Sequence, residues 1–280
     1  MDRPNIFQYL DLVKFLNDWL TYLRKTKNDF SIRNFSKQTG VAVGYMNMIL
    51  KRERSLTEKA FLKIAPHLGL LEDEKKFMNL LRVLGLTEEP KLRLDCLNEM
   101  MKFKKFRTVN ASENRTFDYL TKWHHVAIYE MFNLDGFEMT PENIQKRLKR
   151  KLTIADIEQS LEFLKQHQFI NENPNGTWTQ ASPRLDCTEG IYKISLGEFH
   201  KQMLELAHES IHRSTRDERF IMGQTMAVNK QDFEKIKQII QRAVDSINEV
   251  NKGSLDKNNV YHIEIAAFPL LTTQLEEPTK

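Results

Sequence analysis

The sequence predicts a mainly helical protein with a few small β elements, and three observations support this fold class. Apolar residues recur at helical spacing over several long stretches. Ser and Thr residues stand where they can cap helix N-termini. Short runs of β character lie only beside a turn at residues 173–176 and within the last hundred residues. The length of 280 residues allows two or three domains, and a composition that is 40% hydrophobic and 29% charged is typical of globular proteins.

The first expected element is an amphipathic helix over residues 6–23. A second helix begins at Ser31, a good N-cap residue, and runs towards residue 38. Gly40 then provides the backbone freedom for a sharp turn, and a third helix follows at once, with Met46 and Ile49 facing inward. This helix–glycine–helix order is the basic plan of a repressor-type helix-turn-helix, whose second helix is placed for the major groove.

The helix-turn-helix is followed by further apolar helices. One begins at Thr57, whose hydroxyl can cap free N–H groups, and Pro66 is expected to kink it or to end it early. Another covers residues 77–86. Residues 87–112 are the expected connector, with a helical stretch and several basic residues.

The middle of the chain has the pattern of a winged helix. A helix is expected over residues 117–132, a second begins at Thr140–Pro141 and a third at Thr153. Residues 169–170 and 177–179 flank an Asn-Pro-Asn-Gly turn and predict a hairpin. Three helices and a hairpin together form this winged-helix-like pattern.

The last hundred residues read as helix, strand, helix, strand. The expected elements are helices over residues 195–212 and 231–250 and strands over residues 219–228 and 260–268. The predicted organisation is therefore a helix-turn-helix domain over 1–86, a connector helix over 87–112, a winged-helix-like domain over 113–185, and a C-terminal αβαβ domain for dimerisation or effector binding over 186–280. So small an α/β element needs more sheet or a second subunit to bury its surface, although closure within one chain is an alternative.

Charge is segregated along the chain. Residues 1–110 contain 21 Lys or Arg against 13 Asp or Glu, whereas residues 111–280 contain 21 against 25. The net charge of +4 therefore hides a basic N-terminal part and a mildly acidic remainder. This layout is common in nucleic-acid-binding proteins, although a solvated helical surface would have the same composition.

The expected DNA-contacting residues lie on the helix-turn-helix and in the loop that follows it. Asn47 can pair bidentately with adenine, Val43 can touch a thymine methyl group, and Tyr45 can stack or bond a phosphate. Lys51, Arg52 and Arg54 are placed to lie beside a phosphate strand, where contacts give affinity but no sequence information. The full expected set is Arg33, Val43, Gly44, Tyr45, Asn47, Lys51, Arg52 and Arg54. Because few of these groups read bases, one subunit alone is expected to have little specificity.

The winged-helix-like unit is expected to be structural or to face a partner. Its presumed recognition helix carries Asp156, Glu158, Gln159 and Glu162, and acidic side chains there would repel phosphate. The basic run over residues 146–151 is the counter-argument, so a secondary nucleic-acid contact by this unit stays open.

Several segments, in order along most of the chain, resemble a family of bacterial helix-turn-helix transcriptional regulators that carry a C-terminal domain of unknown function. The family is multiplied into many paralogues in certain bacteria, predatory ones among them. The matching segments are residues 5–11 with 14–16, Phe30–Ser31, residues 56–59, residues 119–128, residues 199–204, and residues 260–263 with 268–270. The resemblance implies DNA binding and transcription regulation. Pro66 departs from the helix former expected there.

Catalytic chemistry has little support in the sequence. No nucleophile elbow, metalloprotease, P-loop or dinucleotide-binding motif is present, so no enzyme activity, catalytic residue or cofactor is predicted. His208 and His212, with His200 on the same helix, have a spacing that could place imidazoles on a metal, but charged helix faces commonly look like this and no metal site is predicted. Cys96 and Cys187 are isolated, which argues against a zinc site or a disulfide scaffold and favours a reducing cytoplasm.

The sequence therefore predicts a cytoplasmic DNA-binding transcriptional regulator with no signal peptide or membrane span. Its expected partners are double-stranded DNA, a second copy of the chain, and an unidentified small-molecule or protein effector. The alternative is a protein-interaction or small-ligand-binding protein that uses the helix-turn-helix as a scaffold. A metal-dependent hydrolase built around the helix with the three histidines is the third hypothesis. The operator, the regulated genes, the direction of regulation and the effector are not encoded in these patterns.

Overall fold

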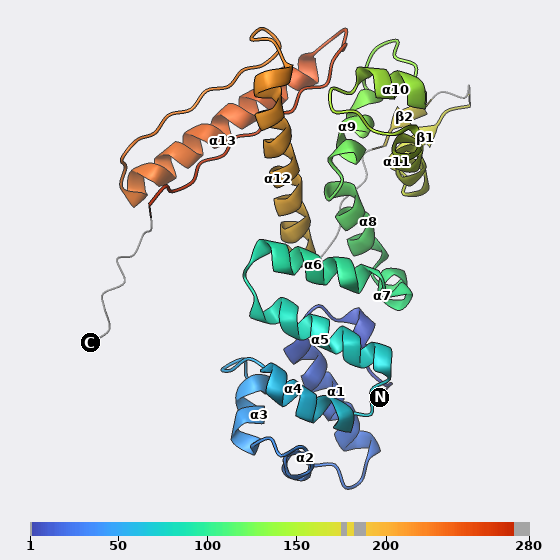
Figure 1. Ribbon diagram of the computed structural model, residues 1–280, viewed down its shortest axis with the longest axis vertical. Coiled ribbons are helices and arrows are strands. Elements are labelled where there is room, and N and C mark those ends of the chain that lie inside the picture. The colour runs from blue at the N-terminus through green and yellow to red at the C-terminus, as the bar shows by residue number, and fades with distance from the viewer. Residues whose placement is uncertain (1, 175–177, 182–188, 272–280) are drawn as a thin grey trace. The chain divides into compact units, whose positions relative to one another are not determined.

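The structure, a computed structural model, describes residues 2–174, 178–181 and 189–271. It is mainly helical with one small antiparallel sheet of two strands, which confirms the predicted fold class (Figure 1). The chain divides into two compact units. Unit 1 comprises Met1–Thr121 and Arg184–Glu198, and unit 2 comprises Lys122–Pro183 and Phe199–Lys280.

All the regular elements among the described residues of unit 1 are helices. Its elements are the 3-10 turn η1 (Ile6–Gln8), α1 (Leu12–Thr26), α2 (Ile32–Thr39), α3 (Val43–Leu50), α4 (Glu58–Ile64), the 3-10 turn η2 (Ala65–His67), α5 (Glu72–Leu86), α6 (Pro90–Met101), α7 (Lys104–Val109), α8 (Ala111–Leu120) and the first turns of α12 (Glu189–Arg213).

The N-terminal segment differs from the single helix expected over residues 6–23. The chain forms the 3-10 turn η1, becomes extended at Tyr9, and starts α1 only after Asp11. The reason is a cap: the Asp11 carboxylate accepts hydrogen bonds from the N–H groups of Val13 and Lys14 at 2.8 and 3.0 Å. Those groups have no intrahelical acceptor at a helix start, so the cap fixes where α1 begins.

Local helix signals elsewhere in unit 1 are confirmed. Ser31 caps α2 through the Asn34 N–H, and Thr57 caps α4 through the Ala60 N–H. Pro66 ends the α-helical geometry, since α4 stops at Ile64 and continues only as the 3-10 turn η2.

The residues expected to form a connector, 87–112, pack instead in the core of unit 1. Phe106 of α7 is fully buried and its ring centroid lies 5.2 Å from that of Phe77 in α5. Phe103 touches both Phe77 and Phe7, with centroids 5.5 and 5.7 Å apart. Leu97 of α6 is buried in the same cluster. The helices α6 and α7 therefore complete one hydrophobic core with α1–α5.

Unit 2 begins with the winged-helix-like elements. They are α9 (Trp123–Met131), α10 (Pro141–Arg147), α11 (Ile154–Gln166), β1 (Ile170–Glu172) and β2 (Trp178–Gln180), followed by the rest of α12 and by α13 (Lys230–Gly253). The predicted caps are present: Thr140 accepts from the Asn143 N–H, and Thr153 and Asp156 cap each other's backbone. The hairpin is antiparallel with Asn171 opposite Thr179. Residues 175–176 of the expected turn and Thr177, the first residue of its expected second strand, lie outside the described residues.

The helix expected over residues 117–132 is interrupted. Helix α8 ends at Leu120 and α9 starts at Trp123, with Lys122 in an extended conformation between them. The Thr121 hydroxyl donates to the Phe117 carbonyl at 2.7 Å, and the Trp123 N–H donates to the Gln202 side chain at 3.0 Å. One of these bonds is formed within four residues and the other with a side chain 79 residues away, and sequence periodicity reveals neither.

The prediction of two strands in the C-terminal αβαβ domain is wrong. Both helices are present, but residues 219–228 and 260–268 run as extended chain without strand pairing, one on each side of α13 in sequence (Figure 1). An alternating apolar pattern forms a strand only when a neighbouring backbone supplies hydrogen bonds, and the described residues provide none. Helix α13 itself has no buried residue although one face is apolar.

Among the described residues, no helix combines the length and the apolar character needed to cross a membrane.

Candidate nucleic-acid interface

The helix-turn-helix is held by contacts on both sides of its turn. Gly40 adopts the left-handed conformation (φ 63°, ψ 24°) that ends α2 and that glycine accepts without strain. The Ser36 hydroxyl donates to the Val41 carbonyl across the turn, and the Thr39 hydroxyl donates to the Phe35 carbonyl at 2.9 Å. These bonds fix the angle at which α3 leaves α2.

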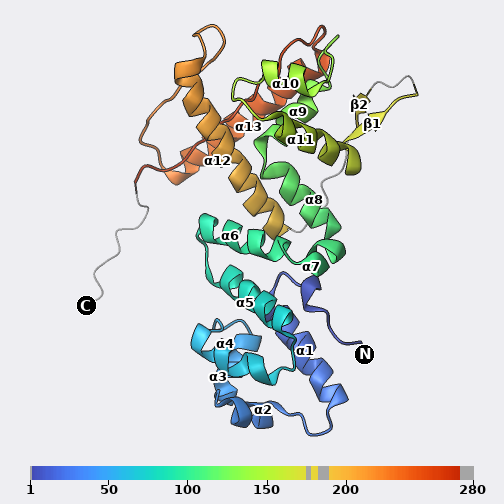
Figure 2. The same cartoon turned by 45° about the vertical axis from the view of Figure 1, so that its right-hand side comes forward.

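Helix α3 is anchored to the core by one face. Met46 and Ile49 are completely buried, as predicted. From α1, the Asn17 side chain donates a hydrogen bond of 3.2 Å to the Leu50 carbonyl at the end of α3. Figure 2 shows α3 beside α2 and α4 at one end of unit 1. Helix α3 is therefore held by core packing on one face and by a bond from α1 at its end.

The outer face of α3 is exposed and largely unbonded. Asn47 is exposed, and in the part of the chain that the structure describes its amide has no hydrogen-bond partner. Gly44 is exposed too, and a Cβ placed there would meet no atom within 4 Å. Val43 is half-buried at the first turn, and Arg33 is exposed on α2. On the outer face of α3 itself, the Asn47 amide is therefore the group available for hydrogen bonding to a base.

The Tyr45 hydroxyl is already hydrogen-bonded within the protein. It donates to the Ser55 carbonyl at 2.8 Å and accepts from the Thr57 N–H at 3.2 Å. It therefore ties α3 to the start of α4 and positions the loop between them. The expected phosphate bond from this hydroxyl would have to replace an internal bond.

The loop after α3 has a defined conformation. The N–H groups of Glu53 and Arg54 both donate to the Met48 carbonyl, at 2.8 and 3.3 Å, and close the end of the helix. Arg52 adopts a left-handed conformation (φ 65°), which is uncommon for a residue with a side chain.

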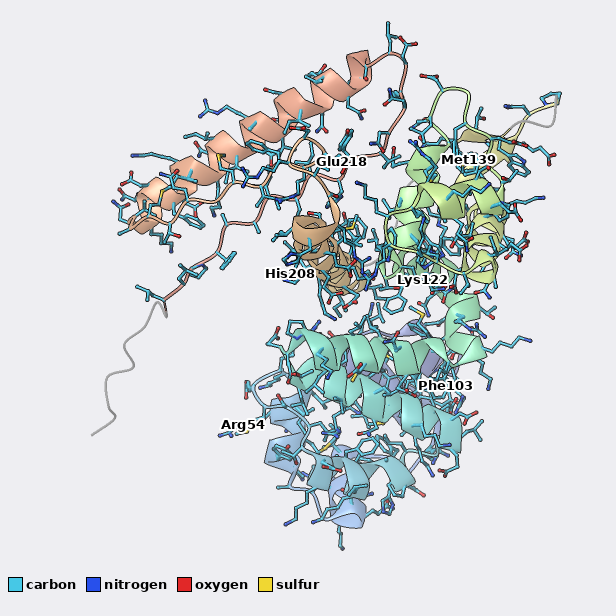
Figure 3. The ribbon with its side chains drawn as sticks, turned by 45° about the horizontal axis from the view of Figure 1, so that its top comes forward. Arg54, Phe103, Lys122, Met139, His208 and Glu218 are labelled. Atoms are coloured by element: carbon cyan, nitrogen blue, oxygen red, sulfur yellow. The ribbon has the colours of Figure 1, made fainter. Side chains whose placement is uncertain are left out.

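The three cations of this loop do not have equal roles. Arg52 pairs with the carboxylate of Asp11, with 2.6 Å between Nη2 and Oδ2. Lys51 and Arg54 are exposed, and neither has an ion pair or a hydrogen-bonded side chain among the described residues. Figure 3 shows Arg54 extending away from the helices. Two of the three predicted phosphate-contacting cations are therefore free, and the third is already neutralised.

The environment of Asp11 maintains this pairing. Burial opposes ionisation of the carboxyl, but the hydrogen bond from Arg52 and those from the Lys14 and Val13 N–H groups outweigh it. The net result is a lowered pKa for Asp11, so the Asp11–Arg52 pair is charged at neutral pH. Asp11 was not among the expected site residues. Its position before an apolar helical run is typical of a helix N-cap, and it does not indicate a pairing with Arg52.

In the winged-helix-like unit, most charges of the basic run are already bonded. Lys149 lies 2.9 Å from Glu218, and Arg150 lies 3.5 Å from Glu209. Arg147 and Lys151 donate to backbone carbonyls at 2.6 and 2.9 Å. The outer face of α11 presents exposed acidic residues, as expected. This arrangement favours a structural use of the run over phosphate binding.

The histidines of α12 do not assemble a metal centre in the described part of the chain. The rings of His208 and His212 are 6.3 Å apart, and His200 contacts Glu264 at 3.0 Å. No group of three or more His, Cys, Asp or Glu side chains within residues 2–174, 178–181 and 189–271 is arranged to hold a metal ion. Cys187 lies outside these residues.

Comparison with known proteins assigns the second half of the chain to a family. Residues 100–270 match a domain of unknown function, DUF4423, and the match starts in α6, after the helix-turn-helix. Neither a curated protein nor a solved structure matches the chain. Because the matched residues make up more than half of the 280, the chain belongs to the DUF4423 family.

Proposed function

We propose that this protein is a DNA-binding transcriptional regulator of the bacterial cytoplasm that acts as a homodimer. The observation that carries the proposal is the exposed surface of α3 and of the loop after it, where the side chains of Asn47, Lys51 and Arg54 have no hydrogen-bonded or ionic partner among the described residues. A helix placed this way can enter a major groove while the two cations reach the flanking phosphates. Lone cysteines, one of them the buried free thiol Cys96, fit a reducing compartment.

In this proposal α3 contacts the bases and the loop after it contacts the phosphates. Gly44 lets the backbone of α3 approach a groove closely because no side chain stands between them. Asn47 is the one base-reading amide on this face, so base discrimination by a single subunit is weak. Phosphate contacts from Lys51 and Arg54 then dominate the affinity, and this affinity is strongly salt-dependent.

A salt titration tests the proposal on the full chain. Binding of the Lys51→Ala/Arg54→Ala variant to a fluorescent duplex is compared with that of the wild type at several salt concentrations. The expected loss affects all duplexes, and the slope of log K against log salt becomes shallower by roughly 0.9 for each phosphate contact removed. The matched control is Lys76→Ala/Lys91→Ala, which removes the same charge from exposed positions on α5 and α6.

Two results would contradict DNA binding through α3. One is equal affinity and slope in the loop variant and the wild type. The other is an equal loss of affinity in the control variant, which would show that the loss depends on net charge and not on the position of the two cations.

The homodimer is proposed from the C-terminal arm, defined here as residues 219–271. Its two extended segments and α13 contain no buried residue, and large apolar side chains such as Phe220, Tyr261 and Phe268 are 86%, 71% and 68% exposed. An apolar surface of this kind needs a cover. The two extended segments and the one helix of a single arm cannot supply this cover, since a stable sheet needs three or more strands.

A second copy of the chain fits this arm better than an unrelated partner does. Two arms related by a two-fold axis supply four extended segments and two helices. If the segments pair, they meet the requirement for a sheet with a covered face. The arm contains seven basic and six acidic residues, so two copies do not repel each other. A dimer also doubles the weak base contacts of α3.

Light scattering on the full chain tests the dimer. The wild type is expected at twice its chain mass of 33.1 kDa, and the variant Phe220→Asp/Phe268→Asp at the chain mass itself. Both side chains are exposed in a single chain, so the substitutions should not unfold it. Leu62→Asp/Leu71→Asp, at exposed positions of unit 1, is the control and should remain dimeric. A monomeric wild type would exclude the proposed assembly.

The second candidate function is a protein-interaction or ligand-binding protein that uses the helix-turn-helix as a scaffold. The observation that favours it is the internal use of Tyr45 and Arg52, which leaves few groups to read DNA. The same salt titration separates the two: a scaffold would show no salt-dependent affinity for duplexes.

A further inference from the structure

A cavity of about 330 Å³ lies within unit 1, beneath the loop that follows α3. Five parts of unit 1 line it: the start of α1, the loop after α3, the end of α5, the start of α6 and the first turns of α12. Its volume is at the lower end of the range for small-molecule sites. It is called the arginine cavity below.

The charged residues of the arginine cavity are four arginines and one aspartate. They are Arg52, Arg54, Arg82, Arg93 and Asp11. Asp11 is matched by Arg52. The other three arginines leave the cavity strongly positive, which is a balance suited to an anion.

Arg82 is the most unusual of these groups because it is 8% exposed. Its Nε donates to Asn79 at 2.8 Å and its guanidinium lies over the ring of Phe61 at 5.6 Å. Among the described residues, no carboxylate pairs with it. A buried charge without a counter-ion is costly, so a folded protein normally supplies one or binds one.

Arg93 and Arg54 complete the cationic side of the cavity. Arg93 donates to the carbonyls of Leu84 and Thr87 at 3.3 and 3.0 Å. Among the described residues its ion pair is with Glu88, 3.9 Å away and almost fully exposed. Arg54 has no ion pair among the described residues. Both guanidinium groups retain N–H donors that an oxyanion could accept.

The remainder of the lining is mainly apolar. Leu56, Leu81, Leu97 and Ile191 are buried residues on four different elements of the wall. A bare inorganic anion would leave this surface unfilled. A ligand with an acidic group and a short hydrocarbon or aromatic body would contact both kinds of wall.

From these observations we infer that the arginine cavity binds a small amphiphilic anion, a carboxylate or phosphate ester with a compact apolar body, and that Arg82 is its principal charge partner. The inference does not rest on the proposed DNA-binding function. The cavity nevertheless shares Arg52 and Arg54 with the loop beside α3, so a bound anion would occupy groups next to the candidate DNA surface.

The test uses the full chain and four probes of matched size or charge: hexanoate, hexyl phosphate, neutral hexanol and inorganic phosphate. Isothermal titration measures affinity and thermal unfolding measures stabilisation. At least one of hexanoate and hexyl phosphate is expected to bind saturably, at least tenfold tighter than both hexanol and inorganic phosphate. Hexanoate and hexyl phosphate separate a carboxylate ligand from a phosphate ligand.

The variant Arg82→Met removes the charge and keeps most of the side-chain volume. Affinity for the binding anion should fall at least tenfold, while the ligand-free protein should be as stable as the wild type or more so, because an uncompensated cation has been removed. Arg24→Met, at an exposed position of α1, is the control and should bind like the wild type. Arg54→Met, also exposed, is a second variant that should fold in any case and should lower affinity at least threefold.

The inference is wrong if neither amphiphilic anion binds the wild type, or if hexanol binds as tightly as they do. It is equally wrong if Arg82→Met folds and binds normally. Loss of DNA binding in the salt titration would leave these outcomes unchanged, because none of them is read from DNA.

Discussion

The guanidinium of Arg52 in the loop after α3 lies 2.6 Å from the carboxylate of Asp11, the residue that caps α1. The two are 41 residues apart in sequence, and their pairing fixes the loop beside the candidate recognition helix. Asp11 therefore has two roles: it starts α1, and it removes one positive charge from the surface proposed to meet phosphate.

We predict that Asp11→Asn raises the affinity for duplex DNA by a few-fold. Asparagine remains a good N-cap, so α1 should keep its start. Arg52 loses its partner and becomes available to a phosphate, which should also steepen the salt dependence. Anisotropy titrations at several salt concentrations measure both effects. Asp73→Asn, on the exposed first turn of α5, makes the same charge change as the control, and an equal gain there would refute a specific role for Asp11.

A second pair anchors the N-terminal segment. Arg3 contacts both carboxylate oxygens of Glu74, at 2.7 and 2.6 Å, and the Glu74 side chain is 5% exposed. Burial opposes ionisation of Glu74, but the hydrogen bonds from Arg3 and from the Leu71 N–H outweigh it and lower its pKa. We predict that Glu74→Gln lowers the free energy of unfolding by about 1–3 kcal/mol at pH 7, because it breaks a bidentate pair whose carboxylate is buried and whose guanidinium is partly exposed.

The pH dependence of this pair has a defined sign. A carboxyl with a lowered folded-state pKa stabilises the protein above its unfolded-state pKa, and this contribution is lost as the pH falls through the folded-state pKa. The difference in urea midpoint between the wild type and Glu74→Gln should therefore shrink in acid. Glu72→Gln is the control, since Glu72 pairs with Lys75 from a position that is 78% exposed and should matter little. A constant difference down to strong acid would contradict the assignment.

Local signals predicted the helix-turn-helix well. The Ser31 cap, the left-handed Gly40 and the stop at Pro66 each depend on residues within a few positions, so the sequence displays them directly. The break near the N-terminus is not visible in the periodicity, because the apolar pattern continues on both sides of Asp11 and predicts one helix. In that case the cap decides the helix start and the periodicity does not.

Long-range partners could not be predicted in the same way. The bonds of Tyr45 to the start of α4 and of Arg52 to Asp11 depend on how the helices pack. Likewise, the alternation at residues 260–268 indicates which side chains would share a face of a sheet, but it contains no information on whether a partner strand exists in the same chain. The buried Arg82 is invisible to sequence reasoning because a charged residue at helical spacing normally lies on the solvent side.

The packing of α6 and α7 predicts that a fragment ending at residue 86 is not stable. Phe7 and Phe77, at most 1% exposed, depend on Phe103 and Phe106 for part of their cover. Removing that cover exposes aromatic surface, and each large core side chain contributes roughly 1.5–3 kcal/mol through burial. We therefore expect residues 1–86 to lack a cooperative thermal transition in circular dichroism, while the full chain has one. A sharp transition in the fragment would contradict this expectation and support the predicted domain boundary at residue 86.

The last prediction concerns acid stability in unit 2 and rests on His124 of α9. Its Nδ1 lies 2.8 Å from the Ser160 hydroxyl, which itself donates to the Asp156 carbonyl at 2.7 Å. The hydroxyl proton is thus already used, so the neutral ring donates from Nδ1–H and an added proton must enter at Nε2. Burial, with a smaller contribution from Lys122, lowers the pKa of His124 to about 4.

A histidine with a lowered folded-state pKa destabilises the protein in acid, because the unfolded chain takes up a proton that the folded chain refuses. The stabilising contribution is complete above about pH 6.5 and is lost as the pH falls towards about 4, with an upper limit of about 3 kcal/mol. His124→Gln removes the titration, so the stability of the wild type relative to this variant should decline across that window and then level off. Urea unfolding at pH 7, 5.5 and 4.5 measures the difference, and His208→Gln, at an exposed position of α12, is the control. A wild-type advantage that stays constant between pH 7 and 4.5 would show that His124 is not held neutral by burial.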